Sequence, residues 1–206
     1  MRNRGFVGAG VLGLVLYGTV SAAQDFSRYR EFELGSAVAA VSALTGVAGS
    51  ELKAIHQRPV VVQELTWRPK YGGRRSVPPD TESVDQVVFD FYDDQLFRVT
   101  VNYDRKQTEG LLDADMIDAV SAVYGSQIKP VASKGRQSAA IYDDSGTSIA
   151  TWGNVGNSVT LYRLSAYATS FRLVVTAEPI AALARTAAAR AVVLDAREAP
   201  QREAAR

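Results

Sequence analysis

Two alternating runs, residues 84–92 and 95–103, constrain the fold of this chain more than any other segment. The pair Asp93-Asp94 between them is typical of a tight turn that joins antiparallel strands. Apolar and aromatic side chains recur at alternate positions and predict one buried sheet face, made of Val87, Phe89, Phe91, Phe97, Val99, Val101 and Tyr103. The intervening positions predict a polar face, made of Asp90, Tyr92, Arg98, Thr100 and Asn102. This alternation is what an antiparallel sheet with one buried side requires.

An internal similarity extends this pattern to the rest of the chain. The segment 40–46 recurs as 119–125, and each copy predicts a short amphipathic helix that ends at a glycine, Gly46 or Gly125. A Thr-Trp pair follows each helix, at Thr66-Trp67 and again at Thr151-Trp152. We therefore expect a tandem repeat of a short helix followed by three antiparallel strands.

Strand candidates and a terminal helix complete the predicted architecture, whose class is α+β. The six strands are expected at Val61–Arg68, Val84–Tyr92, Gln95–Tyr103, Ser148–Gly153, Ser158–Leu164 and Phe171–Thr176. A C-terminal amphipathic helix is expected to begin at Pro179 and to fray beyond Ala199. The predicted organisation is a signal peptide at 1–23, a first repeat at 24–107, a second repeat at 108–178, and the terminal helix with its frayed tail at 179–206.

The first residues have the features of a cleaved leader. Arg2 and Arg4 precede an uncharged apolar stretch, Gly5–Val20, and small residues follow at Ser21-Ala22-Ala23. That stretch is shorter than the roughly 20 residues that cross a bilayer, so we expect no stable membrane anchor after its removal. The chain has no cysteine, so neither a lipid on a cysteine nor a disulfide is expected. It also has no Asn-x-Ser/Thr acceptor, which favours a bacterial periplasmic or secreted location.

Composition describes a globular chain without a polyanionic partner. Of the 206 residues, 47% are hydrophobic and 22% are charged. The 23 basic and 22 acidic residues nearly balance, with or without the two leader arginines. Nucleic-acid-binding proteins carry a marked basic excess, so we expect no nucleic-acid partner.

The residues around the first repeat resemble a known family. A predicted helix that carries Leu34-Gly35-Ser36 and ends at Gly46 precedes a Trp-bearing strand and then the run 87–99. This order resembles the bacterial β-lactamase-inhibitor-protein-like repeat, which also occurs in small lipoproteins of outer-membrane protein assembly. The chain after the leader is similar to exported bacterial proteins that have no established activity. The resemblance implies a binding scaffold. It carries over no contact residue, and the lipidated cysteine of the assembly lipoproteins is missing.

Two short motifs suggest hydrolases but have simpler explanations. Asp144-Ser145-Gly146-Thr147 matches one aspartic-protease loop, whereas that chemistry needs two, so a turn is predicted. Ser50-Glu51-Leu52-Lys53 has the spacing of a serine nucleophile and its lysine, without the companion elements of that enzyme class. We therefore interpret Ser50 as a helix N-cap.

The remaining reactive side chains also favour structural roles. His56 is the only histidine, so a histidine-based triad or zinc cluster is not expected. Acidic residues at 113, 115 and 118 lack the spacing of a calcium loop and are typical of a helix N-terminus. The basic loop of Lys70, Arg74 and Arg75 is typical of solvated charge. We predict no catalytic residue, no metal site and no cofactor.

These observations predict an exported, non-enzymatic binding or scaffold protein that contacts another envelope or secreted protein. The expected recognition residues lie on the polar sheet face: Tyr92, Arg98, Trp152 and Tyr162. Coverage of that face by the terminal helix, which would make these residues core, stays open. Two alternatives also stay open. One is a hydrolase-type enzyme with a carboxylate-only site, and the other is a structural envelope component that self-associates through the Ala-rich helix. The oligomeric state is not predicted.

Overall fold

The computed structural model describes residues 24–69, 83–128, 146–166 and 168–204. The predicted leader, residues 1–23, lies outside these ranges. The N-terminal elements are β1 (Arg28–Tyr29), β2 (Phe32–Glu33), α1 (Val38–Thr45), the 3-10 turn η1 (Gly49–Glu51), β3 (Lys53–His56) and β4 (Val62–Trp67). The later elements are β5 (Val84–Tyr92), β6 (Gln95–Tyr103), α2 (Asp113–Tyr124), β7 (Thr147–Gly153), β8 (Asn157–Ala166), β9 (Ala168–Ala177) and α3 (Glu178–Ala204).

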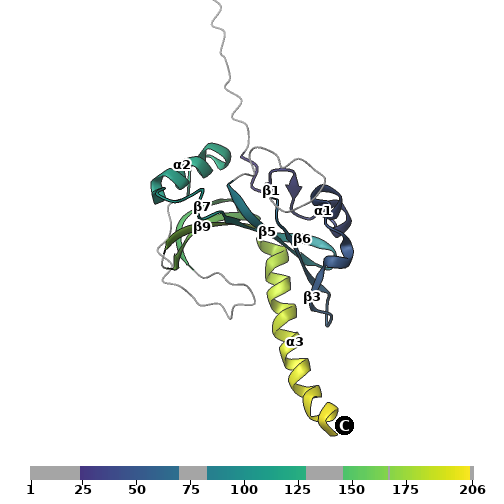
Figure 1. Ribbon diagram of the computed structural model, residues 1–206. Helices are drawn as coiled ribbons and strands as arrows, with labels where there is room; N and C mark the ends of the chain where they lie inside the picture. Colours follow the sequence, from purple (N-terminus) through teal and green to yellow (C-terminus); the bar gives the residue numbers. More distant parts are fainter. Residues whose placement is uncertain (1–23, 70–82, 129–145, 167, 205–206) are drawn as a thin grey trace, which may run out of the picture.

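One seven-stranded antiparallel sheet organises the molecule, in the order β3-β4-β5-β6-β9-β8-β7. Helices α1 and α2 lie on the same side of this sheet, and α3 leaves from its other side (Figure 1). The predicted α+β class and the C-terminal helix are therefore confirmed. Within the described ranges, no helix is both long and apolar enough to cross a membrane.

The hairpin that the sequence predicts most strongly has the predicted bounds at both strands. Asp93 and Asp94, with φ of 49° and 63°, form the turn between β5 and β6. Two consecutive left-handed residues suit a two-residue hairpin, because their backbone twist matches that of the flanking strands. The Asp94 carboxylate also accepts a hydrogen bond of 3.0 Å from the backbone N–H of Val38. The turn thus caps α1, whose own N-cap residue, Ala37, provides no side-chain cap.

The main core lies between the sheet and the two helices α1 and α2. Cross-strand register aligns two apolar rows over six strands. These rows are Leu65-Phe89-Val99-Val175-Val159-Trp152 and Trp67-Val87-Val101-Leu173-Leu161-Ala150. Val41 of α1 and Met116 and Val120 of α2 pack onto this core. Burial of these rows is the main stabilising term, because hydrophobic burial scales with apolar area removed from water.

Phe97 departs from the predicted face. Phe91 pairs with Leu96 and Asp90 with Arg98, so Phe97 is the extra residue of a β-bulge. A bulge turns the side chain of the inserted residue away from strict alternation. Phe97 consequently packs on the other side of the sheet, where Ala177, Ala181 and Ala184 form a second, smaller cluster with it. The prediction that Phe97 shares a face with Val99 is therefore wrong.

Other predicted elements also differ from the structure in their bounds. The prediction of a helix carrying Leu34-Gly35-Ser36 is wrong, because α1 begins at Val38 and Gly35 instead bonds to the Leu96 carbonyl. Strands β1, β2 and β3 are absent from the prediction, because they are too short to show an alternation of apolar and polar residues. Helix α3 continues to Ala204, beyond the predicted fraying point at Ala199. Gly46 ends α1 in the predicted left-handed conformation, with φ 73° and ψ 7°. Gly125 follows α2 with φ 75° and ψ −154°, which is a glycine conformation outside the left-handed helical region.

Candidate functional site

The sheet side opposite α1 and α2 is the polar face. Three rows of cross-strand neighbours define it: Glu64-Asp90-Arg98-Thr176-Ser158, Thr66-Val88-Thr100-Val174-Thr160-Thr151 and Gln86-Asn102-Arg172-Tyr162-Ser148. Hydroxyl, amide and guanidinium groups dominate these rows. The structure places three of the four predicted recognition residues, Tyr92, Arg98 and Tyr162, on this face.

Arg98 is a buried side chain of the polar face rather than an exposed one. It is 8% exposed, and its neighbour across the hairpin, Asp90, is 3% exposed. The Arg98 Nε atom lies 3.9 Å from Asp90 Oδ2 and donates a hydrogen bond of 3.3 Å to the Thr100 hydroxyl. A buried charge that loses its partner is strongly destabilising. Arg98 therefore holds β5 and β6 together.

Tyr92 lies under the start of α3. Its ring packs against the cluster of Phe97, Ala177 and Ala181, and the first turns of α3 contact β5, β6 and β9. The Ser158 hydroxyl donates a 2.6 Å hydrogen bond to Glu178, the first residue of α3. The terminal helix thus covers the polar face at Tyr92 and then runs away from the sheet (Figure 1).

Tyr162 occupies the more accessible end of the polar face. It is half-buried and lies between Arg172 on β9 and Ser148 on β7. Arg172 donates a hydrogen bond of 2.8 Å from Nε to the side-chain carbonyl of Asn102. The side chains of Asn102 and Arg172 are also half-buried. The amide of Asn102, the guanidinium of Arg172 and the phenol of Tyr162 therefore lie side by side across the neighbouring strands β6, β9 and β8.

Trp152 does not lie on the polar face, and its prediction as a surface recognition residue is wrong. The side chain is fully buried in the core beneath α2. A register shift in β7 between Ser148 and Ala150 brings Trp152 opposite Val159, at the end of an apolar row. The indole Nε1–H donates a hydrogen bond of 2.9 Å to the carbonyl of Gly125. Trp152 thus links β7 to the end of α2.

The register also brings two carboxylates opposite each other. Glu64 and Asp90 are cross-strand neighbours on β4 and β5, and Asp90 already pairs with Arg98. Directly opposite residues have Cβ atoms about 5 Å apart. One cavity lies beneath α2 and another lies between Pro59 and α3. Both are lined by other residues, so Glu64 and Asp90 lie in neither of them.

The other sequence candidates fall at separate places. Ser50 lies inside η1 and Ala48 precedes that turn, so the prediction that Ser50 is an N-cap is wrong. Lys53 and His56 lie on β3 at the sheet edge. Asp144, Ser145 and the basic loop at Lys70, Arg74 and Arg75 lie outside the described residues.

The acidic start of α2 is a helix cap, as predicted. Asp115 accepts a 2.7 Å hydrogen bond from the backbone N–H of Leu112, and Asp113 pairs with Arg163 at 2.7 Å. Across the described ranges, no group of three His, Cys, Asp or Glu side chains is arranged to hold a metal ion.

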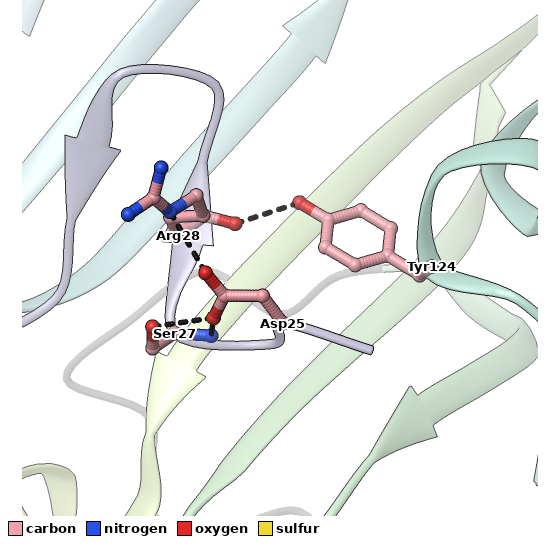
Figure 2. A network of polar contacts seen from close by, with 4 residues as sticks. All are labelled: Asp25, Ser27, Arg28 and Tyr124. Atoms are coloured by element: carbon pink, nitrogen blue, oxygen red, sulfur yellow. Dashed lines mark hydrogen bonds and ion pairs between the residues drawn. The ribbon is translucent and has the colours of Figure 1, made fainter. Parts of the chain in front are cut away.

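A network of polar contacts attaches the N-terminal segment to α2 (Figure 2). The Asp25 carboxylate accepts hydrogen bonds from the Ser27 hydroxyl and amide and pairs with Arg28 at 2.8 Å. The Ser27 donors, followed by Arg28, lower the pKa of Asp25. The Tyr124 hydroxyl donates a 2.9 Å hydrogen bond to the Arg28 carbonyl. This contact fixes the β1–β2 hairpin beside the end of α2.

The chain matches no protein-family model, no curated protein and no solved structure.

Proposed function

We propose that this chain is an exported, non-enzymatic binding protein that recognises another protein of the bacterial envelope, or a secreted one, through the Tyr162 end of its polar face. The observation that carries the proposal is the half-buried row Asn102-Arg172-Tyr162, on a sheet whose opposite face is covered by α1 and α2. Tyrosine and arginine are enriched at interface hot spots, because they combine large contact areas with hydrogen-bond donors. A rigid sheet also presents them at little entropic cost.

The proposal includes a duplicated scaffold that resembles the β-lactamase-inhibitor-protein-like repeat. In the first half α1 precedes the meander β4-β5-β6, with the additional edge strand β3 before it, and in the second half α2 precedes the meander β7-β8-β9; the last strands, β6 and β9, pair at the centre. Thr66 and Thr151 stand at opposite ends of one row. Trp67 and Trp152 stand at opposite ends of the two apolar rows. A two-fold axis between β6 and β9 would exchange each pair, which supports the duplication.

Photo-crosslinking tests the recognition surface. We would replace Tyr162 with p-benzoyl-phenylalanine in the full chain expressed in its host, irradiate whole cells and identify the crosslinked proteins. The same amino acid at the exposed Lys106, in the loop before α2, serves as the control. We expect a discrete protein adduct from position 162 that position 106 does not give. Adducts that are the same from both positions would contradict the proposal.

A purified partner then allows a quantitative measurement. Tyr162→Ala and Arg172→Ala are expected to weaken its binding by about tenfold or more each, as interface anchors do. Lys106→Ala is expected to leave affinity unchanged. Mass spectrometry of the exported chain checks the leader, because a mature N-terminus at Gln24 is the predicted product.

Two alternatives have their own tests. A carboxylate-only hydrolase would use Glu64 and Asp90, so Glu64→Gln would abolish a hydrolytic activity found in a substrate screen. A self-associating component would use the apolar side chains that α3 exposes, among them Leu183 and Val192. In that case Val192→Glu would lower the oligomeric state of the full chain in analytical ultracentrifugation.

A further inference from the structure

A cavity of about 310 Å³ lies between α2 and the sheet, on the side opposite to the polar face. Met116 and Val120 of α2 and Leu173 of β9 form much of its apolar wall. The β1–β2 hairpin and the loop that follows β6 complete the wall. Sites for small molecules begin at about this size, and most of their lining is apolar. The volume therefore suits a small ligand and is too small for a folded partner.

Two residues that line the cavity also expose apolar surface to solvent. Leu111, in the loop before α2, is 39% exposed, and Val123, near the end of α2, is 74% exposed. Apolar side chains left open beside a concave apolar site are a feature of ligand-binding grooves. A ligand with an apolar body would cover these side chains as it enters the cavity, so hydrophobic burial favours such a ligand.

Two tyrosine hydroxyls in the cavity wall differ in their hydrogen bonds. Tyr124 donates to the Arg28 carbonyl at 2.9 Å. Tyr103, at the end of β6, donates its hydroxyl hydrogen to no other residue that the structure describes. Burial raises the pKa of Tyr103 to about 12, so the hydroxyl keeps its proton at neutral pH and is a donor. A tyrosine hydroxyl removed from bulk water normally has a partner, and a ligand that carries an acceptor would supply one here.

The charged side chain in the wall interacts with the protein itself. Arg30, whose φ is 53° in the turn between β1 and β2, lines the cavity. Its guanidinium carbon lies 5.2 Å from the centre of the Tyr29 ring, and it has a further interaction partner in the protein. A carboxylate ligand would therefore lose its hydration without gaining a free counter-charge, and such desolvation is costly. An uncharged ligand avoids this cost.

We propose that the cavity beneath α2 binds a small uncharged molecule that has an apolar body and one hydrogen-bond acceptor, such as a ketone or an ester. The apolar body lies between α2 and Leu173, and the acceptor receives the hydrogen bond of the Tyr103 hydroxyl. This site and the polar face lie on opposite sides of the sheet, so the two proposals succeed or fail independently.

Three probes of nearly the same shape test the proposal. They are acetophenone, which has a carbonyl acceptor, ethylbenzene, which has none, and benzoate, which is charged. Titrations of the full chain, followed by the chemical shifts of its backbone amides, give each affinity and show where the probe binds. Both uncharged probes are expected to shift amides of α2 and β9 around the cavity. Benzoate is expected to bind more weakly than acetophenone.

Tyr103→Phe is the decisive variant, because it removes the donor and keeps the ring. The affinity for acetophenone is expected to fall by about fivefold, the usual effect of one neutral hydrogen bond, whereas the affinity for ethylbenzene should not fall. Comparison of two ligands in two proteins cancels the different hydration of the ligands. Tyr124→Phe is the matched control, because the Tyr124 hydroxyl is bonded to the Arg28 carbonyl. It should leave the ratio of the two affinities unchanged.

Two further measurements separate binding from folding. Without ligand, Tyr103→Phe is expected to be as stable as the native chain in urea at pH 7, because no hydrogen bond within the protein is lost. A clear loss of stability would show that Tyr103 has a partner in the protein and would contradict the proposal. Ala119→Trp, which places a large ring at the cavity wall, should weaken the binding of both uncharged probes.

Three binding results would overturn the proposal. The first is the absence of binding of both uncharged probes at millimolar concentration, or binding that survives Ala119→Trp in a folded protein. The second is a ratio of acetophenone to ethylbenzene affinity that Tyr103→Phe leaves unchanged. The third is tighter binding of benzoate than of acetophenone, which would assign the cavity to anions. Circular dichroism of each variant establishes that it is folded before its affinity is interpreted.

Discussion

Replacement of Trp152 distinguishes a core role from a recognition role for this residue. A buried aromatic side chain removes about 150 to 250 Å² from water, worth roughly 4 to 6 kcal/mol at 25 cal/mol per Å². Because Trp152 is fully buried, we expect Trp152→Ala to lower the free energy of unfolding by about 3 to 5 kcal/mol. Trp152→Phe keeps most of the apolar area but leaves the Gly125 carbonyl without its donor. We therefore expect a loss of about 1 to 3 kcal/mol for that variant.

The assay is urea unfolding followed by far-ultraviolet circular dichroism, which reports the sheet and does not depend on tryptophan. The slope of the free energy with urea should stay constant while the midpoint falls. Trp67→Phe is the matched control, since Trp67 lies in the same core but remains 9% exposed, and its loss should be smaller. An unchanged midpoint for Trp152→Ala would refute the burial argument. Loss of partner binding at unchanged stability would indicate that Trp152 is a recognition residue.

Three further predictions concern the turn, the cavity and the β7–β8 hairpin. Asp94→Ala removes the cap on Val38 at a left-handed position that alanine does not favour, and should cost about 1 to 2 kcal/mol in urea unfolding, whereas Asp94→Asn, which keeps an acceptor and tolerates the left-handed turn, should cost clearly less. The pKa of Tyr103, about 12, exceeds its unfolded value near 10. Its contribution to stability is therefore complete below pH 10 and falls by about 1.4 kcal/mol per pH unit up to pH 12. Tyr103→Phe should flatten this alkaline slope, and identical slopes would contradict the prediction. Gly153→Ala should cost about 1 to 3 kcal/mol, because φ is 152° and the new Cβ would overlap a backbone carbonyl. Gly49→Ala, where the nearest atom is 3.8 Å away, should be close to neutral by the same measurement.

The strongest sequence signals were those that depend on neighbouring residues. Strands β5 and β6 alternate regularly around Asp93-Asp94, and their bounds are as predicted. Pattern and turn residues act within a few positions, so they are readable without the rest of the chain. The same applies to the glycine that follows α1 and to the acidic cap at the start of α2.

The errors in assigning side chains to the two sheet faces came from bulges, which alternation does not reveal. One inserted residue in β6 turns Phe97 to the side of α3, and a register shift in β7 brings Trp152 into the core. A shift of one residue exchanges the two faces of a strand. The polar residue types on β7 and β8 gave the correct face for Tyr162 and the wrong one for Trp152.

The residues that line the cavity beneath α2 share no sequence motif that would have placed them together. Arg30, Tyr103 and Met116 come from a hairpin turn, a strand end and a helix that are far apart along the chain. Each is ordinary in its own segment. The positive φ of Arg30 could have been suspected only if a two-residue turn had been recognised between the very short strands β1 and β2.

By itself, the amino-acid sequence determined the α+β class, the central hairpin, the approximate positions of β4 to β9 and the terminal helix. These features follow from local periodicity and turn residues, which can be read in a segment without knowing what it contacts in the fold. Only the tertiary structure decided that β6 pairs with β9, that Trp152 is core while Tyr162 stays accessible, and that a cavity with Arg30 and Tyr103 forms under α2. Those features arise from register and packing between distant segments, whose energies depend on partners that no single stretch of sequence specifies.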